Sequence, residues 1–131
     1  NSKYPDSDFF LMRAAEAWLT YAEATARANG NVLTAEGKAA IDEIRNRANA
    51  SIKSKYELAD ILDEWAREFY FEGRRRTDLI RFGKFGGNTD YQWQWKGGSE
   101  NGINFSTDLN VFAIPDTELN TNPNLKQNSG Y

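Results

Sequence analysis

The chain has 131 residues, and a chain of this length buries roughly two thirds of the surface that it exposes when unfolded, which is enough for one domain or part of one. It contains no cysteine and no histidine, so it lacks thiolate metal ligands and the commonest general base, and we expect no cofactor and no metal site. Its formal net charge of −3 gives no basic field of the kind that holds nucleic acid, and we expect no nucleic-acid partner.

The first predicted helix covers about residues 8–29. Asp6 or Asp8 can cap its start, and Gly30 can stop it because glycine tolerates a left-handed backbone. The apolar stripe of this helix is rich in small residues, which permit close packing, and we expect Trp18 within the stripe to lie in the core. The stripe consists of Leu11, Ala14, Ala15, Trp18, Leu19, Ala22 and Ala26.

Two further helices are predicted at about residues 35–48 and 55–72, and three helices joined by short connections favour antiparallel packing. Thr34 can cap the second helix. Ser54 and Glu57 fit the capping-box pattern at the start of the third. Each helix has an apolar stripe that we expect in the core: Ala40, Ile41, Ile44 and Ala48 in the second, and Leu58, Ile61, Leu62, Trp65, Ala66 and Phe69 in the third.

Glu64, Glu68 and Glu72 stand four residues apart on the third helix and form an acidic row. Like charges at this spacing repel one another, so we expect a cationic partner, which is either Arg74 to Arg76 or the arginines of another helix. Helical carboxylates at this spacing also build metal sites and acid–base pairs. We favour a structural ion-pair network, because no histidine is present to complete such a site and arginines are close in the sequence.

A fourth, short helix is predicted at residues 78–83, beyond a sharp turn at Gly73. Asp78 can cap its start. We expect Arg75 to point inward toward Glu72 or Asp78, although guanidinium groups also suit phosphate or sulfated sugars. The structural network predicted for this region consists of Glu64, Glu68, Glu72, Arg75, Asp78 and Arg81.

After the helices the composition changes, and glycine and asparagine punctuate a loop-rich segment over residues 86–131. Tyr91, Trp93 and Trp95 alternate within it, so they share one side if the segment is extended. Aromatic faces suit the C–H-rich faces of pyranose rings, which makes these three residues candidates for glycan binding, although we favour packing against the helices because such rings bury a large area. Residues 110–115 form a short apolar run, and turn residues then close the chain.

Residues 71–83, FEGRRRTDLIRFG, resemble the FEG-x-R-x-x-D-L-x-R-[WF]-G signature near the C-terminus of the SusD/RagB family. Residues 11–24 resemble the R-x-A-E-x-x-L-x-Y-A-E-A helix of this family, and residues 41–48 resemble its I-N-x-I-R-x-R-A helix. The matches follow the order of the family and cover nearly the whole chain. Trp65 and Phe82 depart from it, because many relatives have Arg and Trp there.

The resemblance implies a fold and a function. The fold would be mainly α, with antiparallel helix pairs of the tetratricopeptide-like SusD scaffold in residues 1–85 and the loop-rich segment of residues 86–131 packed on these helices. The chain would be the C-terminal part of a larger, non-catalytic lipoprotein, held on the extracellular face of the outer membrane through an N-terminal cysteine that this sequence does not contain. Its partners would be an oligosaccharide or polysaccharide taken up as a nutrient and a TonB-dependent transporter of the SusC type.

Two other classes of function stay open at this point. A carbohydrate-active enzyme needs two carboxylates roughly 5–10 Å apart beside an aromatic subsite. Asp90, Glu100 and Asp108 are the candidates near the tryptophans. A helical-repeat module that binds a peptide would instead offer an open groove between its helices.

Overall fold

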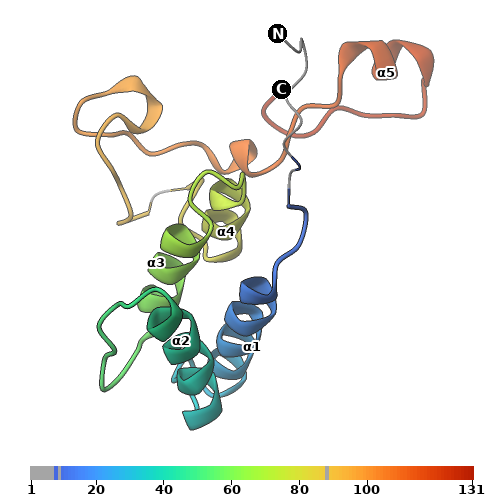
Figure 1. Ribbon diagram of the computed structural model, residues 1–131. Coiled ribbons are helices and arrows are strands. Elements are labelled where there is room, and N and C mark those ends of the chain that lie inside the picture. Colours follow the sequence, from blue (N-terminus) through green and yellow to red (C-terminus); the bar gives the residue numbers. More distant parts are fainter. Residues whose placement is uncertain (1–7, 9, 88) are drawn as a thin grey trace, which may run out of the picture. The chain divides into compact units, whose positions relative to one another are not determined.

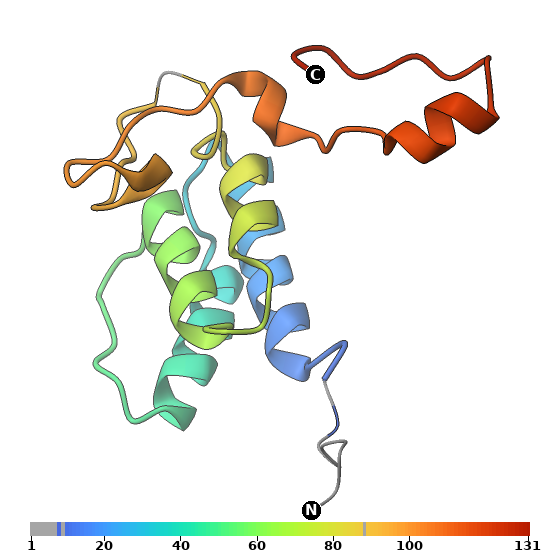
Figure 2. The same ribbon diagram turned by 90° about the horizontal axis from the view of Figure 1, so that it is seen from above.

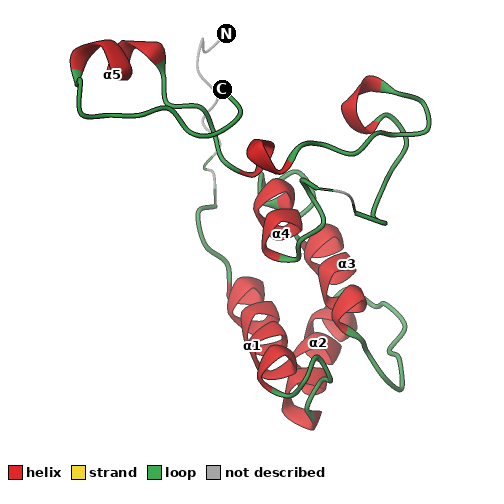
Figure 3. Cartoon of the chain, turned by 180° about the vertical axis from the view of Figure 1, so that it is seen from behind, coloured by secondary structure: helices red, strands yellow, loops and turns green. Residues whose placement is uncertain are grey.

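The computed structural model describes residue 8, residues 10–87 and residues 89–131, and this part of the chain is mainly α-helical, which confirms the predicted fold class (Figure 1). The chain divides into two compact units, Asn1–Tyr70 and Phe71–Tyr131. The described residues contain no β-strand (Figure 3), and none of their helices is both long and apolar enough to cross a membrane. The helices are α1 (Ala14–Ala28), α2 (Ala35–Arg47), α3 (Leu58–Glu68), α4 (Arg75–Arg81) and α5 (Asp116–Thr121), with short 3-10 helices at Lys96–Gly98 and Thr107–Asn110.

The first unit is built from α1, α2 and α3, which lie side by side (Figures 1 and 2). Helix α1 packs against both α2 and α3. Gly30 follows α1 with a φ angle of 63°, so the predicted stop at this glycine is confirmed, and Asn31 after it is also left-handed, with φ 67°. Thr34 caps α2 as predicted, because its hydroxyl oxygen accepts from the N–H of Gly37 at 3.1 Å.

Most residues of the three apolar stripes form the core of the first unit, where Trp65 is 2 % exposed. Leu11 and Ala14 of the first stripe are exposed, because α1 begins only at Ala14. The prediction that Trp18 is also core is wrong, since 46 % of its surface is exposed. Trp18 lies at the flank of the buried stripe of α1 rather than at its centre. Ala48 follows the end of α2 and is exposed as well. The buried apolar residues of this unit are Ala15, Leu19, Ala22, Ala26, Ala40, Ile41, Ile44, Tyr56, Ile61, Leu62, Trp65 and Phe69.

Helix α1 begins at Ala14, later than the predicted start at residue 8. Of the two predicted caps, Asp6 lies outside the described residues and Asp8 is exposed and non-helical. Arg13 occupies the cap position with an extended backbone, at φ −134° and ψ 152°. Its side chain is held by Glu68, as described below, and a residue with this backbone ends the helix on its N-terminal side.

Helix α3 also begins later than predicted, at Leu58 rather than near residue 55. Its capping box is formed by Glu57 and Asp60, not by Ser54 and Glu57. The N–H of Glu57 donates to Asp60 Oδ2 at 2.8 Å. Tyr56, just before the cap, is 2 % exposed, so its buried ring anchors the loop that leads into the helix.

Two ionisable groups at this cap have shifted pKa values. Burial raises the pKa of Tyr56, whose hydroxyl donates to Asp42 Oδ1 at 2.9 Å and accepts from the N–H of Lys53 at 3.1 Å. Burial also raises the pKa of Asp60, but the N–H of Glu57 and the ammonium of Lys53 outweigh it and hold this pKa below its usual value. Lys53 Nζ lies 2.6 Å from Asp60 Oδ1. The ionised form of Asp60 is therefore the form that caps α3.

Helix α3 ends at Glu68, and Phe71 has a left-handed backbone with φ 63°. Glu72 therefore lies beyond the helix, and the predicted acidic row is interrupted after its second member. Gly73 turns the chain with φ 75°, as predicted.

Helix α4 begins at Arg75, before the predicted start at Asp78. Asp78 is not a cap: it lies in the first turn at 1 % exposure, with its Oδ1 2.9 Å from Arg81 Nη1 and 3.9 Å from Arg74 Nη2. Two arginines other than Arg75 therefore approach Asp78.

The second unit begins before α4, whereas the sequence suggested a boundary near residue 85. Its remaining length is mostly loop, as expected (Figure 3). Helix α5 was not predicted, and it lies where only turn residues were expected. It begins directly after Pro115 and has Asp116 and Glu118 in its first turn, both of which favour a helix N-terminus.

Candidate functional site

The first two glutamates of the acidic row are paired with arginines of the other helices of the first unit. Glu64 Oε2 lies 2.6 Å from Arg45 Nη1 of α2 and 2.7 Å from Arg67 Nη2 of its own helix. The side chain of Glu64 is 7 % exposed, so these contacts neutralise a buried carboxylate. The sequence left open whether the cationic partner comes from Arg74 to Arg76 or from another helix. For Glu64 it is an arginine of another helix, Arg45 of α2.

Glu68 joins the same kind of network. Its Oε1 lies 2.7 Å from Arg13 Nη1, and its Oε2 lies 2.5 Å from Arg47 Nη2. Arg13 Nη2 also donates to the carbonyl oxygen of Glu68 at 2.6 Å, and its guanidinium lies 4.3 Å from the ring centre of Phe69. The described residues include no group of three or more acidic side chains that could hold a metal ion.

A third buried carboxylate of the first unit belongs to Glu23, which is 5 % exposed. The indole N–H of Trp65 donates to its Oε2 at 2.9 Å. Arg27 Nε donates to its Oε1 at 2.9 Å, in the favourable i to i+4 order. Trp65, one of the two residues that depart from the family pattern, is therefore both a core side chain and a hydrogen-bond donor to a buried charge.

The three aromatic residues predicted as a glycan-binding row are not arranged along one extended strand. The chain turns at residues 94–95, and Trp95 has a left-handed backbone with φ 66°. Trp95 is 65 % exposed. Tyr91 and Trp93 do lie together, with ring centres 6.2 Å apart in an edge-to-face arrangement. The structure thus brings two of the three predicted residues into contact.

Tyr91 and Trp93 line a cleft with Arg75 and Leu79 of α4. Its volume is ≈ 340 Å³, near the lower end of the range of about 300–1,000 Å³ for small-molecule sites. Arg75 Nη2 donates to the Tyr91 hydroxyl, and the Arg75 guanidinium lies 5.6 Å from the Tyr91 ring centre. The cleft therefore combines aromatic surface with a guanidinium and a phenol, which is the mixture of apolar faces and hydrogen-bonding groups that a sugar requires.

Lys96 was not selected from the sequence, yet it lies directly behind this aromatic pair. It is 1 % exposed, although it carries an ammonium group. Its Nζ lies 4.8 Å from the ring centre of Trp93 and 5.1 Å from that of Phe105, and it is 3.5 Å from the carbonyl oxygen of Tyr91. The only feature of the sequence that could have pointed to Lys96 is its position between the alternating aromatic residues and two glycines.

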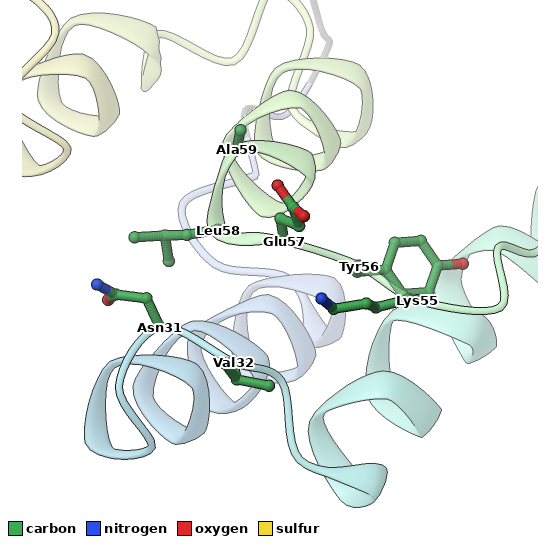
Figure 4. A pocket seen from close by; sticks show the side chains of 7 residues that line it. All are labelled: Asn31, Val32, Lys55, Tyr56, Glu57, Leu58 and Ala59. Carbon is green, nitrogen blue, oxygen red and sulfur yellow. The ribbon is translucent and has the colours of Figure 1, made fainter.

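A second cleft, of ≈ 270 Å³, lies in the first unit between the α1–α2 connection and the start of α3 (Figure 4). Asn31, Lys55 and Glu57 surround it, and the ring of Tyr56 points away toward α2 (Figure 4). Tyr56 is the aromatic residue among those that line this cleft, and its side chain is buried. It is formed by loops and a helix start, so it also differs from the open helix groove expected of a peptide-binding repeat.

Two of the three carboxylates considered for glycoside hydrolysis, Asp90 and Asp108, contact polar groups of their own loops. Asp90 Oδ1 lies 2.7 Å from Lys84 Nζ, and this contact lowers the pKa of Asp90. A general acid needs a raised pKa instead. Asp108 accepts from the Ser106 hydroxyl at 2.8 Å and belongs to the turn that this serine caps.

Comparison with known proteins places the chain among glycan-binding relatives. The sequence model of the SusD family matches residues 1–131. The starch-binding protein SusD of Bacteroides thetaiotaomicron is 48% identical over an alignment of 132 positions, which covers 100% of this chain and 23% of that protein. A solved structure of a SusD superfamily protein from Parabacteroides distasonis matches with a TM-score of 0.76 and 26% identity, over 100% of this chain and 29% of that one. Surface glycan-binding protein A from Bacteroides uniformis matches with a TM-score of 0.74 and 26% identity, over 92% of this chain and 27% of that one. The chain thus spans less than a third of the length of each of these relatives.

Proposed function

The chain belongs to the SusD family, and we propose that it forms part of a non-catalytic cell-surface protein that captures glycans for nutrient uptake. The observation that carries this proposal is the 48% identity to a starch-binding protein, which extends over the whole chain. The substrate class proposed from this relative is an α-glucan of the starch type. In the proposed function the protein is lipid-anchored on the extracellular face of the outer membrane and delivers oligosaccharide to a TonB-dependent transporter of the SusC type.

Within this chain, we assign sugar contact to the cleft of the second unit. Trp93 is 40 % exposed, so its ring offers an aromatic surface to a ligand. Tyr91 is partly buried, so packing holds the other ring of this pair in place. A cleft of ≈ 340 Å³ accommodates one or two sugar rings rather than a long helical glucan. Trp95 is the more exposed of the two tryptophans, and we propose that it extends the contact beyond the cleft.

The proposal is tested by isothermal titration of the full chain with oligosaccharides from starch, fructan, xylan and mannan. We expect saturable binding to malto-oligosaccharides and at least a tenfold loss of affinity in Trp93→Ala, since aromatic stacking contributes about 1–3 kcal/mol per ring in comparable flat ligands. Trp18→Ala is the matched control, because Trp18 is similarly exposed, at 46 %, but belongs to the first unit. Binding that survives Trp93→Ala, or no binding to any of the four glycans, would contradict a sugar site in this cleft.

A further inference from the structure

Lys96 is a buried cation whose described contacts are all neutral. It is 1 % exposed, and its Nζ faces two aromatic rings, those of Trp93 and Phe105, at 4.8 Å and 5.1 Å from their centres. Its hydrogen bond to the Tyr91 carbonyl oxygen is long, at 3.5 Å. An ammonium group loses its hydration on burial, and it is normally paired with a carboxylate when it lies this deep. The position of Lys96 therefore requires an explanation other than ion pairing.

Two of the three contacts of Lys96 belong to residues that line the cleft. The ammonium lies over the ring of Trp93 and against the backbone of Tyr91, and these two side chains form the aromatic wall. The chain closes tightly around this point, because the N–H of Lys96 donates to the carbonyl oxygen of Trp93 at 3.2 Å and the N–H of Ile103 donates to that of Lys96 at 3.0 Å. A change at Lys96 is thus transmitted directly to both wall residues.

Stability alone does not account for a charge at this position. A neutral side chain of the same length would fill the space between the rings without losing hydration, and replacing buried charges by apolar groups is often neutral or stabilising. The cation does have one effect that a neutral chain lacks. Its attraction to the ring quadrupole favours one orientation of the Trp93 indole relative to the ammonium.

We propose that Lys96 is a positioning residue, whose ammonium group holds the Trp93 ring and the Tyr91 backbone in the orientation that binds a pyranose. The inference rests on the proposed function, since it takes the cleft as a glycan site. A wall fixed before the ligand arrives loses less conformational freedom on binding, and this raises affinity without any contact between Lys96 and the sugar.

The charge can be tested separately from the length of the side chain. The chain contains no cysteine, so Lys96→Cys creates a single thiol that can be alkylated in denaturant before refolding. Alkylation with 2-bromoethylamine restores a side chain with as many heavy atoms as lysine and an ammonium at its end. Alkylation with 1-iodopropane gives the same length with a methyl group in place of the ammonium. Lys96→Met, which needs neither alkylation nor refolding, provides an independent neutral variant.

Three quantities are measured on each form: the affinity for malto-oligosaccharide, the urea midpoint of unfolding, and the 19F spectrum after labelling with 5-fluorotryptophan. The chain has four tryptophans, so the spectrum should contain four resonances. We expect the aminoethyl form to bind malto-oligosaccharide with an affinity within about twofold of that of the unmodified chain. The propyl and Met forms should bind roughly tenfold more weakly, because they lack a desolvated cation–π contact of the corresponding strength. Their urea midpoints should equal or exceed that of the aminoethyl form. The Trp93 resonance, assigned with Trp93→Phe, should shift in the neutral forms while the other three stay in place.

Equal affinities of the charged and neutral forms would overturn the proposal. A urea midpoint that falls in the neutral forms would overturn it as well, because the ammonium would then stabilise the fold. If the unmodified chain binds no glycan, the proposed function fails independently of Lys96. The 19F spectrum still decides the inference in that case, since an unchanged Trp93 resonance would show that the ammonium does not orient the ring.

Discussion

Glu64 is contacted by two arginines that differ in burial, and we expect their removal to have unequal effects on the stability of the first unit. Both guanidinium groups approach the same oxygen, Oε2, with Arg45 at 2.6 Å and Arg67 at 2.7 Å. The Arg45 side chain is 13% exposed and the Arg67 side chain 54% exposed. Arg45 Nε also donates to the carbonyl oxygen of Ser51 at 2.7 Å, so its burial and this additional hydrogen bond both make Arg45 the more costly residue to remove.

The magnitude follows from the environment of each pair. Removing one partner of a buried ion pair costs about 3–5 kcal/mol when the other charge is left uncompensated. Arg67 remains beside Glu64 when Arg45 is removed, so we expect the cost of Arg45→Met to be lower, about 2–3 kcal/mol. Arg67→Met should cost less than about 1 kcal/mol, because solvent screens the exposed pair and water replaces it.

The two variants are compared by urea unfolding followed by far-UV circular dichroism, with the slope of the transition checked for constancy. For a unit of this size, the expected loss in Arg45→Met corresponds to roughly 10–20 °C in Tm. Arg45→Met should lower the free energy of unfolding by less in a Glu64→Gln background than in the wild type. The difference between the two losses measures the interaction between Arg45 and Glu64. Equal losses in Arg45→Met and Arg67→Met would refute the argument from burial.

Two further predictions concern the loop around the cleft and the cap of α3. A Cβ at Gly102 would lie 2.5 Å from the carbonyl oxygen of Trp93 on a backbone with φ +75°, whereas a Cβ at Gly98, with φ +83°, would meet nothing within 4 Å. Gly102→Ala should therefore destabilise the second unit by about 2–3 kcal/mol and Gly98→Ala by about 1 kcal/mol in urea unfolding, and equal effects would contradict the close approach. Asp60→Ala should cost about 1 kcal/mol at pH 7 through loss of the capping box. The pKa of Asp60 is lowered in the folded state, so its ionised carboxylate stabilises the fold at pH values above the ordinary aspartate pKa. This stabilisation is lost as the pH falls through the pKa of the folded state. The difference in unfolding free energy between wild type and Asp60→Ala should therefore narrow between pH 5 and about pH 3.

The helical scaffold could be predicted from the sequence because its signal is repetitive. The apolar spacing of Ile61, Leu62 and Trp65 specifies a buried face whatever the neighbouring helices are, and the structure buries all three. Helix ends depend on single residues and their tertiary partners, and here the prediction was less accurate. Helix α1 begins late because the backbone of Arg13 is extended, and the side chain of Arg13 contacts Glu68, 55 residues away in the sequence. No local pattern contains that contact.

The cleft was only partly predictable for the same physical reason. Alternation identified Tyr91 and Trp93, but it also placed Trp95 beside them, because an alternating pattern says nothing about a left-handed residue that turns the chain. The wall contributed by Leu79 required knowledge of where α4 lies relative to the loop within the second unit. The contact of Arg75 with the hydroxyl of Tyr91, 16 residues away in the sequence, was not predicted, because no local pattern contains it.

Buried carboxylates meet cationic partners in both units, including Asp78 with Arg81 in the second unit, whereas the described contacts of the buried Lys96 are neutral, and this difference helps to locate function. In the first unit, the carboxylates of Glu23, Glu64 and Glu68 each meet a cationic partner, so their burial is compensated within the scaffold. In the second unit, the described contacts of Lys96 are two aromatic rings and a carbonyl oxygen. A compensated charge is sufficiently explained by packing and stability. Cation–π attraction and one long hydrogen bond compensate poorly for the lost hydration of an ammonium, so we attribute the charge to the orientation that it imposes on its neighbours. On this argument, the aromatic wall that Lys96 supports is the part of the chain where a change should affect affinity more than stability.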